Sequence, residues 1–156
     1  MQIRPFADTD AEKLSLIFFR AVREGALSGY SHEQVAAWAP SPPDPDMYRQ
    51  RRQQGRIFLV ACDEAGEAVA YCDVERDGHV DHLFCMPEQM GQGIASQLYD
   101  EIERCAHANA IGRLFVEASE VARPFFLRKG FSMLKRNTIL RQGVTLHNYS
   151  MDKRLD

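Results

Sequence analysis

Two glycines, Gly91 and Gly93, stand between an apolar strand-like run that ends at Cys85 and a helical pattern that begins near residue 93. A helix N-terminus leaves backbone N–H groups unpaired and carries partial positive charge. Because glycine has no Cβ, an anion can come close to those N–H groups. The spacing therefore predicts a site for a ligand that carries phosphate.

Two common phosphate loops do not fit this segment. A P-loop has Lys and Ser or Thr after its last glycine, whereas Gly93 is followed by Ile94 and Ala95. A dinucleotide fingerprint has a third small residue, here at Ser96, and lies in a parallel βαβ unit. The strands that precede Gly91 are predicted to be antiparallel, which argues against that class.

The second candidate group is "HVDHLFC", residues 79–85. Strand alternation places His79, Asp81, Leu83 and Cys85 on one face, opposite Val80, His82 and Phe84. His79 titrates near neutral pH and can accept a proton, while Asp81 orients it or holds a substrate cation. The alternative, in which both residues only bond the nearby turn and backbone, stays open at this point.

The elements that position these groups follow from hydrophobic periodicity, caps and turns. Asp8 or Thr9 is expected to cap the first helix and Ser31 the second, and the arginines of residues 47–54 are interpreted as a solvated helix face. Strands are expected at 1–6, 56–62, 68–75, 79–85, 112–118, 131–140 and 144–151, and helices after residue 9 and at 31–38, 47–54, 93–108 and 122–129. One domain over residues 1–156 is predicted.

Composition excludes several classes. The 156-residue chain has a net charge of −3, which gives no general affinity for nucleic acid or anionic membranes. The sequence shows neither a membrane-spanning apolar run nor a signal peptide, so a cytoplasmic location is expected. The four cysteines form no C-x-x-C pair, so no metal site is predicted and buried thiols are expected, with Cys85 a weak candidate nucleophile.

"LFCMPEQMGQGIA" resembles the acetyl-CoA-binding segment of the GCN5-related N-acetyltransferase (GNAT) superfamily, and "ASEVARPFFLRKGF" resembles its second segment. The order of elements is similar across almost the whole chain. The resemblance implies an α/β (α+β) fold with a mixed, mostly antiparallel twisted sheet of about seven strands and helices on both faces. It also implies acetyl-CoA as cosubstrate, without a metal.

The resemblance further implies that the strands ending at Cys85 and near Ala118 splay apart around the pantetheine arm. The residues expected at the cofactor are Phe84, Cys85, Met86, Met90, Gly91, Gln92, Gly93, Ile94, Ala95, Ser96, Ser119, Phe126 and Arg128. Met90, Ser119 and Phe126 depart from the family pattern. Phe126 stands where many members have a Tyr that protonates the departing thiolate, and Tyr149 is the predicted replacement.

The predicted activity is acetyl transfer to an amine by direct attack in a ternary complex, with His79, Asp81 and Tyr149 as catalytic candidates. The acceptor is expected to be a small molecule, and the net acidity favours a cationic one. Tyr30, His32 and Glu117 are the substrate-binding candidates, and Trp38 is either pocket or core. Neither nucleic acid nor membrane is an expected partner, and a homodimer is possible. A non-catalytic acyl-CoA sensor and an unrelated nucleotide-binding domain are the alternatives.

Overall fold

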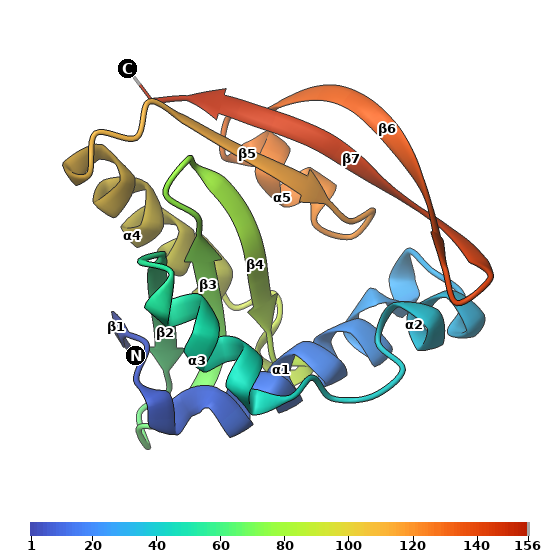
Figure 1. Cartoon of the computed structure of the whole chain (residues 1–156), viewed down its shortest axis with the longest axis horizontal. Helices are drawn as coiled ribbons and strands as arrows, with labels where there is room; N and C mark the ends of the chain where they lie inside the picture. Colours follow the sequence, from blue (N-terminus) through green and yellow to red (C-terminus); the bar gives the residue numbers. More distant parts are fainter. Residues whose placement is uncertain (156) are drawn as a thin grey trace.

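The computed structural model describes residues 1–155, which form a sheet of seven strands with helices on both faces (Figure 1). The strands are β1 (Gln2–Pro5), β2 (Ile57–Cys62), β3 (Ala68–Val74), β4 (His79–Cys85), β5 (Arg113–Ala118), β6 (Ser132–Arg141) and β7 (Val144–Arg154). The α-helices are α1 (Ala11–Arg23), α2 (His32–Trp38), α3 (Pro45–Gln53), α4 (Ile94–Ala108) and α5 (Arg123–Arg128). Short 3₁₀ helices are η1 (Asp8–Asp10), η2 (Gly25–Ser28) and η3 (Pro87–Gln89). The predicted domain limit at residue 156 lies outside the described residues.

The strand order is β1-β2-β3-β4-β5-β7-β6, and every neighbouring pair is antiparallel except β4 and β5. The predicted mixed, mostly antiparallel sheet is therefore confirmed. Leu59 and Ala61 of β2 pack in the core that includes α4, while Phe58 and Val60 pack with α1 and α3 on the other face. Within residues 1–155, no helix is long and apolar enough to cross a bilayer.

Local signals account for the helix starts, with one correction. The hydroxyl of Ser31 accepts from the backbone N–H of Gln34, and the Gln34 side chain accepts from Ser31, so the predicted capping box at α2 is confirmed. At α1 the N-cap residue is Asp10 instead of Asp8 or Thr9. Asp8 and Thr9 belong to the 3₁₀ helix η1, which directly precedes α1. The Asp10 carboxylate accepts hydrogen bonds from Arg4 and from the backbone N–H of Ala7.

Strand β4 contains a bulge at Asp81. His82 pairs with Asp73 of β3, but Val80 pairs with Val74, so Asp81 is an extra residue on β4. A bulge interrupts the two-residue alternation of faces. The prediction that His79, Asp81, Leu83 and Cys85 share one face is therefore wrong: Leu83 and Cys85 pack against the core that includes α4. Phe84 packs on the α1 face, where the ring of His82 stacks on Phe18.

The parallel pair β4–β5 is joined only at its start. His79 pairs with Phe115 and Val80 with Val116, and no further pairs follow. Beyond this point β5 continues along β7 while β4 turns away (Figure 1). The expected splay of the two strands is present, and it opens a gap in the middle of the sheet.

Candidate functional site

Two cavities lie at the gap between β4 and β5. The β7 cavity, about 420 Å³, is bounded by β4, β5, α2 and the residues Leu146–Asn148 of β7. The α4 cavity, about 380 Å³, is bounded by η2, α5 and the loop of Gly91 and Gly93 before α4. Five residues line both cavities, namely Trp38, Leu83, Phe84, Ser119 and Ala122. The two cavities therefore meet at the gap in the sheet.

The loop that carries the two glycines has the geometry of an anion site. Gly91 has φ 80° and Gly93 has φ 82°, a left-handed conformation that favours glycine. A Cβ placed on either residue would find no atom within 4 Å, so the space beside this backbone is open. Gly93 is the N-cap of α4, and no side chain caps the helix. The open loop and the uncapped N–H groups fit a diphosphate.

Most of the expected cofactor residues line the α4 cavity. They are Phe84, Cys85, Met90, Gly91, Gly93, Ile94, Ala95, Ser96, Ser119 and Arg128. Met86 and Gln92 line neither cavity, and the Gln92 side chain bonds the carbonyl of Glu88. Phe126 lines the β7 cavity instead. Their contacts with a cofactor stay predictions.

The hydroxyl of Ser96 already has a partner. The Nζ of Lys129 donates to the Ser96 hydroxyl at 2.6 Å and to Asp100 at 2.7 Å. Lys129 therefore ties the end of α5 to the first turn of α4. Arg128, the neighbouring cation, lines the α4 cavity and has no ion pair among the described residues.

The β7 cavity is walled by aromatic side chains and carries charges of both signs. Phe18, Tyr30, Trp38 and Phe84 provide the aromatic surface. Two carboxylates, Asp81 and Glu117, and the guanidinium of Arg141 also line it. Of the predicted substrate-binding residues, Tyr30 and Glu117 therefore lie at the cavity, whereas His32 is exposed at the start of α2 and lines neither cavity.

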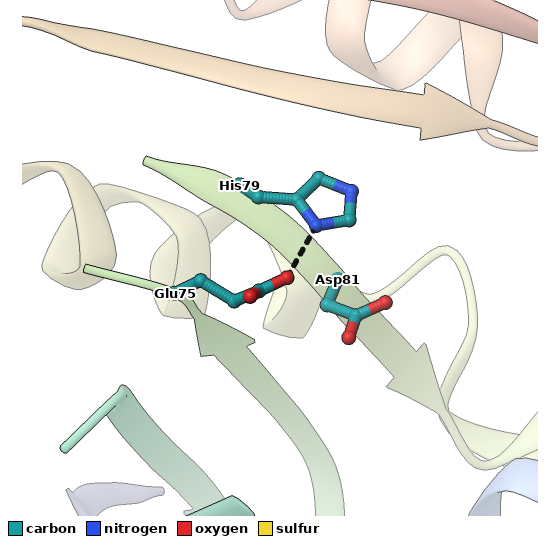
Figure 2. Close-up of side chains that lie close together, drawn as sticks. All are labelled: Glu75, His79 and Asp81. Carbon is teal, nitrogen blue, oxygen red and sulfur yellow. Dashed lines mark hydrogen bonds and ion pairs between the residues drawn. The ribbon is translucent and has the colours of Figure 1, made fainter. Parts of the chain in front are cut away.

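His79 and Asp81 lie close together, with Glu75 beside them (Figure 2). One ligand atom from each of the three residues lies within 4.8 Å of the others. The two ring nitrogens of His79 are occupied, however, Nδ1 by Glu75 at 2.7 Å and Nε2 by Glu117 at 2.7 Å. Burial lowers the pKa of His79, but the hydrogen bonds that its ring makes to the carboxylates of Glu75 and Glu117 outweigh burial, and the net pKa is raised.

Asp81 is paired with arginine. Its carboxylate accepts from Arg56 at 2.8 Å and from Arg51. Burial raises the pKa of Asp81, but the two arginines outweigh burial and the net pKa is lowered. His79 and Asp81 are thus each paired with charged neighbours, His79 with two glutamates and Asp81 with two arginines. Their predicted catalytic roles stay predictions, and His79 lines neither cavity.

The bulge itself is held by a buried carboxylate that sequence reasoning missed. The Asp73 side chain is 0% exposed and accepts from Arg51 at 2.7 Å, from Arg56 at 3.2 Å and from the backbone N–H of His82 at 2.9 Å. Arg51 is only 12% exposed, so the prediction of a solvated face is wrong for this arginine. Nothing in "MYRQRRQQ" by itself separates Arg51 from its neighbours.

Tyr149 lies next to Glu120 rather than at a cavity. Its hydroxyl donates to Glu120 at 2.8 Å, and the Nε2 of His147 lies 2.9 Å from the same carboxylate oxygen. Hydrogen bonds from Arg123, then from His147 and Tyr149, lower the pKa of Glu120 to about 2. Tyr149 lines neither cavity, and this placement does not favour it as the acid for the thiolate.

A residue that sequence reasoning placed on the wrong side of the strand is His82. It lines the β7 cavity directly before Leu83 and Phe84, which line both cavities. Its Nδ1 lies 2.9 Å from the hydroxyl of Tyr71. The alternation pattern could not identify His82, because the bulge at Asp81 depends on the pairing with β3.

Comparisons with known proteins agree with this geometry. Residues 26–153 match the model of the acetyltransferase (GNAT) domain family. An uncharacterized N-acetyltransferase of Escherichia coli K12, YafP, is 30% identical over 97% of this chain and 94% of its own length. The crystal structure of a GCN5-related N-acetyltransferase from Rhodopseudomonas palustris has a TM-score of 0.88 at 30% identity, covering 99% of this chain and 95% of that one.

A more distant solved structure has the same fold. A phosphinothricin acetyltransferase of Sinorhizobium meliloti, solved in complex with acetyl-CoA, has a TM-score of 0.79 at 19% identity, covering 99% of this chain and 88% of that chain.

Proposed function

Since the chain belongs to the GNAT acetyltransferase family, we propose that it transfers the acetyl group of acetyl-CoA to the amine of a small molecule by direct attack. The enzyme is an acetyl-CoA-dependent N-acetyltransferase. The observation that carries the proposal is the pair of cavities that meet at the gap between β4 and β5. Such an arrangement lets two reactants enter through separate cavities and meet at the gap in the sheet.

The α4 cavity is the side that suits the acetyl donor. The open backbone at Gly91 and Gly93 and the uncapped start of α4 provide N–H donors for the diphosphate. The unpaired edge of β4 at Phe84 and Cys85 can bond the pantetheine arm through its backbone, because β5 has already turned away. Arg128 also lines this cavity and suits the nucleotide end.

Direct attack is supported by the state of the one thiol at the site. Cys85 lines the α4 cavity, and burial, with Glu88 adding to it, raises the pKa of its thiol to about 11. A thiol with this pKa is protonated at neutral pH and is a poor nucleophile. A covalent acetyl-cysteine step is therefore disfavoured, and transfer in a ternary complex remains the simpler route.

The charges of the β7 cavity bear on the acceptor. Asp81 is neutralised by two arginines and Glu117 lies on His79, so neither carboxylate is free to hold a second cation. Arg141, in contrast, lines the cavity and forms no ion pair within residues 1–155. We therefore propose a small amine that also carries an anionic group, such as an amino acid, which fits a cavity of about 420 Å³. This differs from the cationic acceptor that the net charge favours.

The test is thiol release from acetyl-CoA with matched pairs of acceptors, each pair an amino acid and the amine formed by its decarboxylation. We expect the amino acids to be preferred, and Arg141→Ala to raise their KM about tenfold while leaving the decarboxylated amines unchanged. Arg104→Ala, at an exposed arginine of α4 that lines neither cavity, is the control.

Equal use of both members of every pair would contradict the acceptor proposal. Binding of acetyl-CoA without turnover of any amine would contradict the enzymatic proposal itself and favour the sensor alternative.

A further inference from the structure

The side chain of His82 is held in one orientation. Its backbone N–H donates to the buried carboxylate of Asp73, which fixes the main chain at the bulge. Its ring stacks on Phe18, with centroids 5.4 Å apart, and meets the edge of Phe84. These contacts restrict the rotation of the ring.

A chain of hydrogen bonds assigns the tautomer of this ring. The hydroxyl of Tyr48 lies 3.2 Å from the carbonyl of Leu14 and 3.0 Å from the hydroxyl of Tyr71, which in turn lies 2.9 Å from Nδ1 of His82. A carbonyl can only accept, so Tyr48 donates to Leu14 and Tyr71 donates to Tyr48. The oxygen of Tyr71 then accepts from Nδ1, which must carry the proton.

The two tyrosines keep this direction because both are neutral. Burial raises the pKa of Tyr48 to about 12 and raises the pKa of Tyr71 well above its ordinary value. Both hydroxyls are therefore protonated at neutral pH. The Nε2 atom of His82 is therefore left with a lone pair.

Nε2 is the ring nitrogen of His82 that does not bond Tyr71. It forms no hydrogen bond with the described residues. His82 lines the β7 cavity, so Nε2 is the ring nitrogen available to a molecule in this cavity. By comparison, both nitrogens of His79 are taken by carboxylates, and Nε2 of His147 lies on Glu120.

We propose that the acceptor amine attacks as its neutral free base, and that Nε2 of His82 accepts a proton from it as the C–N bond forms and returns this proton to the sulfur as the C–S bond breaks. The amine thereby becomes an amide and the thiolate leaves as the thiol, so protons and charges balance. One residue then supplies both the base and the acid. The acid role is the one that Phe126, which lines the same cavity, cannot fill. The inference rests on the proposed acetyl transfer.

The surrounding charges suit such a shuttle. The charged groups near His82 are two arginines, Arg51 and Arg56, which are paired with two aspartates, Asp73 and Asp81. Burial, followed by Arg51, lowers the pKa of His82 to about 4. The imidazole is thus neutral and ready to accept at neutral pH, and its protonated form readily gives the proton to a thiolate, whose thiol has a pKa of roughly 8.5. The amine nitrogen becomes far more acidic once it bonds the acetyl carbon, so a weak base suffices.

The first experiment compares kcat of His82→Gln and His82→Ala with wild type, using acetyl-CoA and the best amine of the acceptor panel. We expect kcat to fall about 100-fold or more in both, with the Kd of acetyl-CoA changed less than threefold. Added imidazole is expected to restore part of the rate of His82→Ala only.

A variant that keeps kcat within about threefold would overturn the proposal. A fall in kcat of the His82 variants that is matched by an equal loss of acetyl-CoA binding would also overturn it. So would a fall in kcat in His147→Gln with none in the His82 variants.

The second experiment does not depend on turnover, so it separates this inference from the proposed function. Nitrogen chemical shifts of the histidine rings, assigned by comparison with His82→Gln, report which nitrogen carries the proton. We expect the Nδ1–H form for His82 in wild type and a shift toward the other tautomer in Tyr71→Phe, together with a smaller loss of kcat. An Nε2–H form in the wild-type protein overturns the inference even if no amine is ever turned over.

Discussion

Replacing Gly93 with alanine tests the proposed diphosphate site most directly. Gly93 has φ 82°, and a Cβ added to it meets no atom within 4 Å. Steric clashes therefore add nothing to the loss of stability in Gly93→Ala. The loss is only the cost of a non-glycine residue in the left-handed region, about 1–2 kcal/mol. For a chain of this size, such a loss lowers Tm by about 2–8 °C.

A matched control separates this strain from ligand binding. Gly66, in the turn between β2 and β3, has φ 83°, and an added Cβ again meets nothing within 4 Å. It lines neither cavity. Gly66→Ala and Gly93→Ala should therefore lower Tm by similar amounts in the absence of ligand.

Only Gly93→Ala should weaken acetyl-CoA binding. The strained loop relaxes and turns its N–H groups away, or the new Cβ occupies the space of the diphosphate, and we expect Kd to rise at least about tenfold. At a ligand concentration of 100 times the wild-type Kd, the stabilisation by acetyl-CoA then drops from about 2.7 to about 1.4 kcal/mol. Calorimetric Kd values and thermal unfolding with and without acetyl-CoA measure both. An unchanged Kd in Gly93→Ala, or an equal rise in Gly66→Ala, would refute the assignment of the diphosphate to this loop.

Two further predictions concern the network at the bulge. Arg51→Met removes one partner of the fully buried Asp73 carboxylate and should lower the free energy of unfolding by about 3–5 kcal/mol. The control is Arg52→Met, at a neighbouring arginine that is 54% exposed, which should change this free energy by less than about 1 kcal/mol. Urea unfolding distinguishes the two variants, and equal effects would contradict the role given to Asp73. In the folded state burial lowers the pKa of His79, but the carboxylates of Glu75 and Glu117 outweigh burial, so the pKa is raised. The stability that protonated His79 contributes is therefore complete below its unfolded pKa of about 6.5, and it is lost as pH rises through the higher folded pKa. His79→Asn should therefore flatten the decline in stability between about pH 6 and pH 9, and a decline identical to that of wild type would argue against the bridge.

His79 and Asp81 show what strand periodicity in the sequence can and cannot predict. The sequence correctly predicts β4 and places these two residues near each other at its start. It does not predict that Asp81 is an extra residue opposite β3, because a bulge is a property of two paired strands. Every residue of β4 after the bulge therefore lies on the face opposite to the one that simple alternation predicts, and His82 lines the β7 cavity.

Ser31, Gly91 and Gly93 illustrate what the chain encodes locally. The capping box needs only residues that lie three positions apart, and a left-handed turn needs only glycine, so both follow from the sequence alone. The succession of strands and helices along the chain is also encoded locally, because each element is marked by a periodicity within a window of about ten residues.

The site depends on contacts between distant segments, and only the tertiary structure decides these. Tyr48, Tyr71 and His82 come from α3, β3 and β4, and no short pattern links them. The buried carboxylate of Asp73, which bonds the backbone of His82 at the bulge, needs the charges of Arg51 and Arg56 as partners. Local preferences select the elements because they act between neighbours in the chain. The direction in which His82 points was settled by the register of two strands and by a buried charge that needed partners from elsewhere.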